Sequence, residues 1–225
     1  MKYLKYMFKN GINVMTISFI LSSFLYSQQS SNSEYPQYLF PEFSESEILL
    51  KDGQQQTELL NYNTVTEKIV CMQDDSPYDL MNTVLIDTVF MQNRKFVPYG
   101  KIFHEILVTG TYTLFLQNRS DLVPAGKPVG YGGTSQGVSS YYLSKHELAP
   151  EYINIKIPPD VRVKADPVFW ILKEGDMLDF KNKKQFIELF PEKEDEIKNL
   201  IRKNRIKFDN TDDVINLINY INNQD

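Results

Sequence analysis

The sequence predicts an α+β protein: a mainly antiparallel β part, built as a small barrel or sandwich-like domain, precedes a β-hairpin and about three short C-terminal helices. Short runs rich in Val, Ile, Thr, Tyr and Phe recur about every ten residues between residues 47 and 180, and tight-turn signals separate them. After Asn182 the apolar residues lie three and four positions apart, which is typical of helices. These two patterns divide the chain into a β-rich domain (47–180) and a C-terminal helical tail (181–225) that we expect to pack on it.

Turn chemistry organises the β-rich domain. Asp52-Gly53 is a strong hairpin signal, because Gly adopts a positive φ without steric cost. Residues 74–77, Asn93 and residues 109–111 mark further reversals. The order of strand, Asp-Gly turn, strand and turn resembles the rhythm of small SH3-like and Sm-like barrels. The predicted strands are residues 48–50, 57–62, 65–73, 78–80 leading to 84–91, 95–98, 102–108, 112–116, 152–157, 168–172 and 177–180.

Two segments of the chain predict irregular structure. Residues 28–46 begin polar and Ser-rich, which indicates a flexible linker, but Tyr38, Leu39, Phe40 and Phe43 then favour a strap docked on the β domain or on a partner. Residues 118–140 contain five glycines and predict a long surface loop. Neither the spacing nor the context of these glycines matches a phosphate-binding loop. The candidate binding residues beside this loop are Tyr131, Tyr141 and Tyr142.

Local signals delimit the helices of the tail. Asn182 predicts the cap of a first helix that buries Phe186. Pro191 starts a second helix, which ends at Asn204, and Asn210 or Thr211 caps the last one. The apolar stripes of these helices predict packing faces and no cofactor site.

Residues 1–27 have the layout of a secretory signal peptide. Lys2, Lys5 and Lys9 precede an apolar run at residues 12–26, and small or polar residues follow. The run is short for a membrane span and contains several polar residues, although an uncleaved N-terminal anchor is the alternative. The sequence therefore predicts an exported protein of the periplasm or cell surface, without an integral span after cleavage.

Composition limits the partners. The formal net charge is -5, and Asp52, Asp74 and Asp75 occupy the turns, which disfavours nucleic acid as a partner. Cys71 is the only cysteine, so the chain has no internal disulfide, and we expect Cys71 to be a small buried hydrophobe. We expect the only tryptophan, Trp170, to be largely buried.

Several phrases of the sequence resemble a group of uncharacterised exported Bacteroidota proteins. The phrases are LKDG and LNYN (50–53 and 60–63), DTVFMQNRKFVP (87–98) and the tail from WILKEGD to INYIN (170–222). The resemblance implies export and a β-rich part followed by a short helical tail. It brings no catalytic residues.

Catalytic and metal-binding motifs do not stand out in the sequence. His104 and His146 are each followed by Glu, but neither begins an H-E-x-x-H motif, so no metal site is predicted. Ser135 and Ser139 lie in the Gly-rich loop outside any nucleophile-elbow pattern. The sequence predicts no catalytic residue and no cofactor.

Three functions remain as hypotheses. The first is a non-enzymatic exported protein that binds a macromolecular partner, such as another protein. The second is a carrier for a lipid or another small apolar ligand, which predicts a sizeable apolar cavity. The third is a hydrolase with dispersed carboxylates, which predicts a cleft holding at least two acids.

Overall fold

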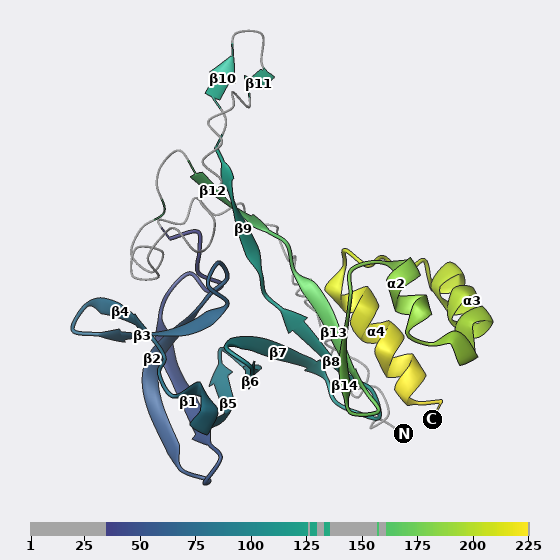
Figure 1. The fold of residues 1–225 in the computed structure, drawn as a ribbon, viewed down its shortest axis with the longest axis horizontal. Helices are drawn as coiled ribbons and strands as arrows, with labels where there is room; N and C mark the ends of the chain where they lie inside the picture. Colours follow the sequence, from purple (N-terminus) through teal and green to yellow (C-terminus); the bar gives the residue numbers. More distant parts are fainter. Residues whose placement is uncertain (1–34, 126, 130–132, 136–156, 158–160, 225) are drawn as a thin grey trace, which may run out of the picture. The chain divides into compact units, whose positions relative to one another are not determined.

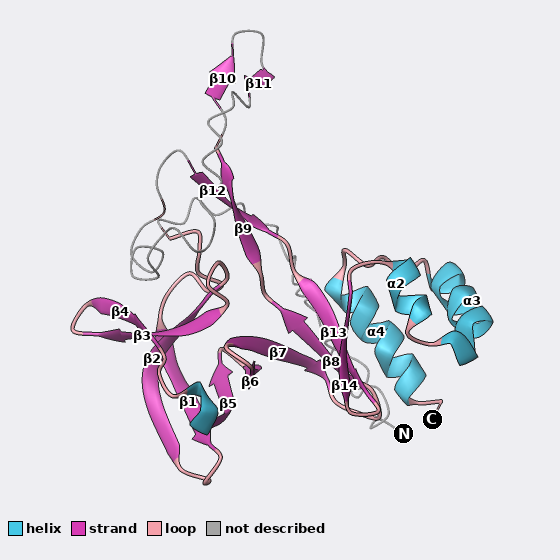
Figure 2. Cartoon of the chain, in the orientation of Figure 1, coloured by secondary structure: helices cyan, strands magenta, loops and turns pink. Residues whose placement is uncertain are grey.

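The computed structural model of the protein describes residues 35–125, 127–129, 133–135, 157 and 161–224. Strands dominate these residues, and short helices follow them at the C-terminal end, which confirms the predicted fold class (Figure 2). One antiparallel sheet has ten strands in the order β14 (Asp176–Phe180), β13 (Val168–Lys173), β8 (Thr113–Gln117), β7 (Ile102–Val108), β6 (Arg94–Tyr99), β5 (Ile86–Met91), β1 (Ser44–Leu50), β2 (Gln55–Asn63), β3 (Lys68–Gln73) and β4 (Ser76–Asp79) (Figure 1).

The sheet is open rather than closed into a barrel. β14 pairs only with β13, and β4 pairs only with β3, so the described ladders leave the two outermost strands apart. The barrel form of the prediction is therefore wrong. The chain inserts β1 between β5 and β2, a non-sequential neighbourhood that turn signals do not reveal.

The predicted turns owe their shape to residues with positive φ. Gly53 has a φ of 87°, and its N–H donates to the Leu50 carbonyl at 2.9 Å, which closes the β1–β2 hairpin. Glu174 and Gly175 both have positive φ, as a type I′ hairpin turn requires. The predicted strand at 65–73 is shorter in the structure, because residues 64–67 form the β2–β3 turn and β3 begins at Lys68.

Part of the predicted Gly-rich loop is in fact a strand. β9 (Ser120–Pro124) follows β8 after two residues and pairs with β12 (Val161–Ala165), while β10 (Lys127–Val129) pairs with β11 (Gly133–Ser135). Leu122 and Val163 of this ribbon pack beside the buried Val65, which explains why the segment is extended despite its loop-like composition.

One face of the sheet carries both large hydrophobic cores. The register of seven neighbouring strands aligns a single row of side chains on this face, and alternation along a strand keeps them together. Ile48, Val89 and Phe96 of this row belong to one core. Leu116, Phe169 and Phe180 belong to the other. Glu105 lies between the two cores. The row is Ile48, Val89, Phe96, Glu105, Leu116, Phe169 and Phe180.

The helices α2 (Lys183–Glu188), α3 (Glu194–Asn204) and α4 (Thr211–Asn222) form where their caps predict, and a short 3₁₀ turn, η2 (Pro191–Lys193), joins the first two. The Asn182 side chain accepts a hydrogen bond from the Gln185 N–H at 3.1 Å, and Asn210 accepts one from the Asp212 N–H at 2.9 Å. The buried residues of the three helices join the core that contains Phe180. Asn222 also bonds the backbone of Tyr112, so the tail is tied to the sheet.

Residues 35–43 form the predicted strap, and they dock on the β domain. The Leu39 N–H donates to the Tyr62 carbonyl at 2.9 Å, and Phe40 is buried in the core with Phe96. The linker or strap predicted at 28–46 ends earlier than expected, because β1 already begins at Ser44. The strap is therefore part of the folded structure rather than a free segment.

Candidate functional site

An aromatic cluster lies on the face of the sheet opposite the two cores. The His104 ring contacts the rings of Tyr99 and Trp170 edge-on, with ring centroids 5.6 and 5.5 Å away. Tyr99 is half-exposed, Trp170 is intermediate, and His104 is fully buried. Trp170 is thus largely but not fully buried.

A carboxylate and an amide complete this cluster. The Gln117 amide donates to the Glu67 carboxylate, and the Trp170 indole N–H donates to the Gln117 carbonyl oxygen at 2.7 Å. Glu67 reaches the cluster because the β2–β3 turn places its carbonyl against the Phe103 N–H at 3.1 Å. Both Glu67 and Gln117 are buried.

His104 is electrostatically unusual. Neither ring nitrogen has a hydrogen-bond partner among the described residues. Burial lowers the pKa of the imidazole to about 4, although the nearby Glu67 acts in the opposite direction. The ring is therefore neutral at pH 7. Because His104 is wholly covered by its neighbours, its position supports a packing role rather than proton transfer to a substrate.

Replacing His104 with leucine should flatten the pH dependence of stability. Its pKa in the folded state lies below the unfolded value of about 6.5, so the unfolded chain binds the extra proton as the pH falls from about 6.5 to about 4. The wild type should lose stability across this window relative to His104→Leu, by about 3 kcal/mol, and the difference should level off below pH 4. Urea unfolding of both proteins at several pH values measures this, and parallel curves would contradict it.

The face of the sheet that carries the two cores holds a polar cluster, which lies between them. The Arg94 guanidinium donates twice to the Glu105 carboxylate, once from Nε at 2.6 Å, and the Asn118 amide donates to the same carboxylate at 2.9 Å. Arg94 also lies over the rings of Phe40 and Phe96, at 5.3 and 5.6 Å. These contacts indicate a structural pair that lets an acid lie between two apolar clusters.

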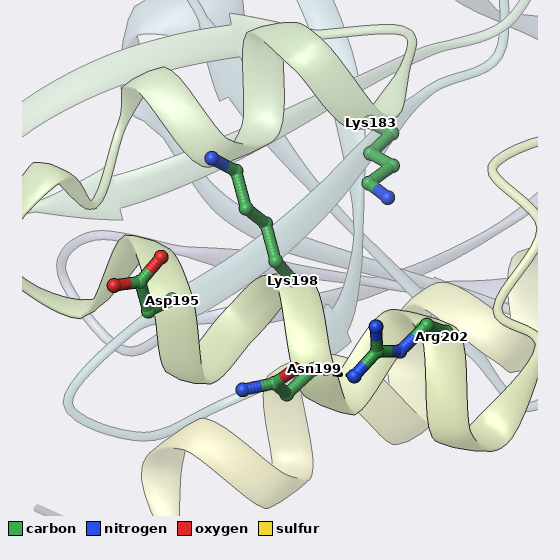
Figure 3. Close-up of a pocket in the computed structure, with 5 residues that line it drawn as sticks. All are labelled: Lys183, Asp195, Lys198, Asn199 and Arg202. Carbon is green, nitrogen blue, oxygen red and sulfur yellow. Dashed lines mark hydrogen bonds between the residues drawn. The ribbon is translucent and has the colours of Figure 1, made fainter.

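Two hollows open on the helical tail. The larger, of about 530 Å³, is lined mainly by polar and charged side chains: Lys183, Asp195, Lys198, Asn199 and Arg202 (Figure 3). Lys198 is paired with Glu194, and Arg202 donates to Asn199 at 2.9 Å. The second hollow, of about 330 Å³, lies between α3 and α4. The larger hollow is not the apolar cavity that a carrier requires, and it contains a single acid, Asp195.

Among the residues that the structure describes, the most exposed apolar side chains lie in one short segment between β3 and β5, residues 78–85, which we call the crossover segment. It contains the end of β4 and the 3₁₀ turn η1 (Thr83–Leu85). Its outward side chains are Tyr78, Met81, Val84 and Leu85, with exposed fractions of 55%, 75%, 77% and 58%.

Both ends of the crossover segment are fixed. The Leu80 N–H donates to the Ile69 carbonyl at 2.8 Å, and the Leu85 carbonyl accepts from the Lys51 N–H at 2.9 Å. The Leu80 side chain packs inward on the core that contains Phe96, and Asn82 adopts a left-handed conformation. The sequence interpretation missed this surface, because it assigned Val84 and Leu85 to a strand. Asn82 and Thr83, between Met81 and Val84, were the available signal for a break.

Several residues predicted from the sequence lie outside the described residues. They are the proposed binding residues Tyr131, Tyr141 and Tyr142, together with His146, Ser139 and most of the strand predicted at 152–157.

Cys71 is half-buried rather than fully buried. Burial raises the pKa of its thiol, so it is not a reactive thiolate.

Among the residues that the structure describes, no three His, Cys, Asp or Glu side chains lie close enough together to hold a metal ion. None of the described helices is both long enough and apolar enough to cross a membrane.

The fold and these surfaces define an open-sheet α+β protein with a short helical tail. No protein-family model matches the chain, and comparisons with curated proteins and with solved structures find no match.

Proposed function

We propose that the chain is an exported, non-enzymatic protein that binds another protein in the periplasm or at the cell surface, with the crossover segment as its contact surface. Export rests on the basic, apolar and polar succession of residues 1–27. The resemblance to exported Bacteroidota proteins supports the same compartment.

One observation carries the binding role: four large apolar side chains, each more than half exposed, are concentrated within eight residues. Single exposed apolar residues are ordinary, but a concentration of them marks an interaction surface. The fixed ends of the segment hold these side chains outward before a partner arrives, which lowers the entropic cost of binding. Met and Tyr are also residue types enriched in protein interfaces.

The other two functions have less support. A carrier needs an apolar cavity, whereas the larger hollow is lined mainly by polar and charged groups. A carboxylate hydrolase needs two acids in one cleft, and the same hollow offers one acid among basic side chains.

Site-specific photo-crosslinking in the native host tests the proposal. A photoreactive amino acid at Met81 should give one discrete protein adduct in the periplasmic or surface fraction. A matched probe at the exposed Lys203 of α3 should not give that adduct. Changing Val84 and Leu85 together to serine should reduce the Met81 adduct at least about tenfold, since both side chains would lie in the interface.

The outcomes separate the location from the binding role. A chain found only in the cytoplasmic fraction would contradict export. An adduct that forms equally at Met81 and Lys203, or that survives both serine substitutions, would contradict the crossover segment as the contact surface.

A further inference from the structure

The outer edge of β2 is open over residues 55–59. The partners of these residues in the described ladders all lie in β1, and β3 pairs with β2 only from Leu60 onward. All five side chains are exposed, on both faces of the strand. Figure 1 shows the β3–β4 hairpin extending away from β2.

The hydrogen-bonding pattern of the β1–β2 hairpin shows which backbone groups of β2 face away from β1. The Leu50 N–H donates to the Gln54 carbonyl at 2.8 Å, so Gln54 directs its backbone toward β1. Alternation along an antiparallel strand then turns the N–H and C=O of Gln55 and Thr57 toward the open edge. An extended strand laid along this edge would find donors and acceptors already in line.

The other edges of the sheet carry features that discourage pairing. β4 contains Pro77, which lacks an N–H, and β14 carries Asp176 and Asp179. Residues 55–59, Gln-Gln-Thr-Glu-Leu, contain neither proline nor a basic residue. The open edge of β2 is therefore the one best suited to accept a strand.

We infer that two copies of the chain pair through this edge, antiparallel, about a twofold axis at Thr57. In that register Gln56 of each copy faces Glu58 of the other, so an amide donates to a carboxylate and no like charges meet. Leu59 faces Gln55 of the second copy. Shifting the axis by one residue onto Glu58 would bring the two Glu58 carboxylates together, which fixes the register. This dimer is independent of the crossover segment.

Sedimentation of the protein purified from the fraction in which it accumulates tests the inference. Because a strand of five residues makes a small interface, we expect a monomer at about 10 μM and an increasing share of dimer toward about 1 mM. Thr57→Pro removes the outward N–H but spares the β1 ladder, and it should weaken dimerisation at least about tenfold. Thr57→Val keeps the N–H and the β-branched shape, so its dimerisation should match the wild type.

Cysteine cross-linking decides the register. In a Cys71→Ser background, Thr57→Cys should give a disulfide-linked dimer on oxidation. Glu47→Cys, directly opposite Thr57 but on β1, should not, because it lies one strand further from the axis. If Thr57→Pro fails to fold, as judged by circular dichroism, this pair still gives the answer. A monomer at every concentration, a dimer insensitive to Thr57→Pro, equal cross-linking at both positions, or a monomer carrying a bound peptide would each overturn the inference.

Discussion

Replacing Arg94 with methionine is expected to lower the free energy of unfolding by about 3 kcal/mol. Glu105 is buried, and its neighbours in the row across the sheet are Phe96 and Leu116, one from each core. Without the guanidinium its carboxylate would keep one neutral donor among the described residues, Asn118, in an apolar setting. Urea unfolding followed by the fluorescence of Trp170, the only tryptophan, measures the loss.

The double variant Arg94→Met with Glu105→Leu is the matched control. It removes both charges, so it should recover much of the stability that Arg94→Met loses. If the double variant is as unstable as the sum of both single variants, the two charges do not act as a pair. If Arg94→Met alone changes the unfolding midpoint little, the carboxylate is solvated and the role assigned to the pair is wrong.

Local chemistry made much of the fold predictable. The Asp52-Gly53 turn needs a positive φ, which Gly adopts without steric cost, so the sequence alone predicts it. The caps Asn182 and Asn210 mark helix starts through a side-chain bond to the backbone only two or three residues away. Signals of this range can be read without knowing the tertiary structure.

Other features depend on pairing between distant segments. No local sequence pattern predicts that β1 lies between β5 and β2. Likewise, no local pattern predicts that Leu122 and Val163 pack together, so that part of a Gly- and Pro-rich stretch forms a strand. The expected closure into a barrel was wrong for the same reason, because closure is decided by strand order and register rather than by turns.

The candidate surfaces also combine features that local sequence predicts with features that only the tertiary structure decides. The composition of the crossover segment is visible in the sequence, but the exposure of Met81 and Val84 depends on the chain crossing from β4 to β5 with Leu80 turned inward. Glu67, His104 and Gln117 meet only because the β2–β3 turn packs against β7 and β8. Residue type therefore suggested candidates, while the folded topology decided which are exposed and which are buried.

The second large effect concerns Phe180, the end of the row that joins the sheet to the helical tail. Its fully buried ring stacks on Phe169 at 5.5 Å between centroids and meets the edge of Phe186 of α2 at 4.9 Å. Phe180→Ala should leave a cavity beside Phe169 and Phe186 and lower the free energy of unfolding by about 3–5 kcal/mol. Phe180→Leu should lower it less, because leucine conserves more of the side-chain volume.

Because this ring belongs to the sheet and to the tail at once, the two parts should unfold together. The helical signal in circular dichroism and the Trp170 fluorescence should show one common midpoint in the wild type and one common, lower midpoint in Phe180→Ala. If the helical signal is lost first while the Trp170 midpoint stays unchanged, then residues 181–225 fold as a separate unit. Coincident transitions would instead make the tail an integral part of the β domain, held by the same hydrophobic core.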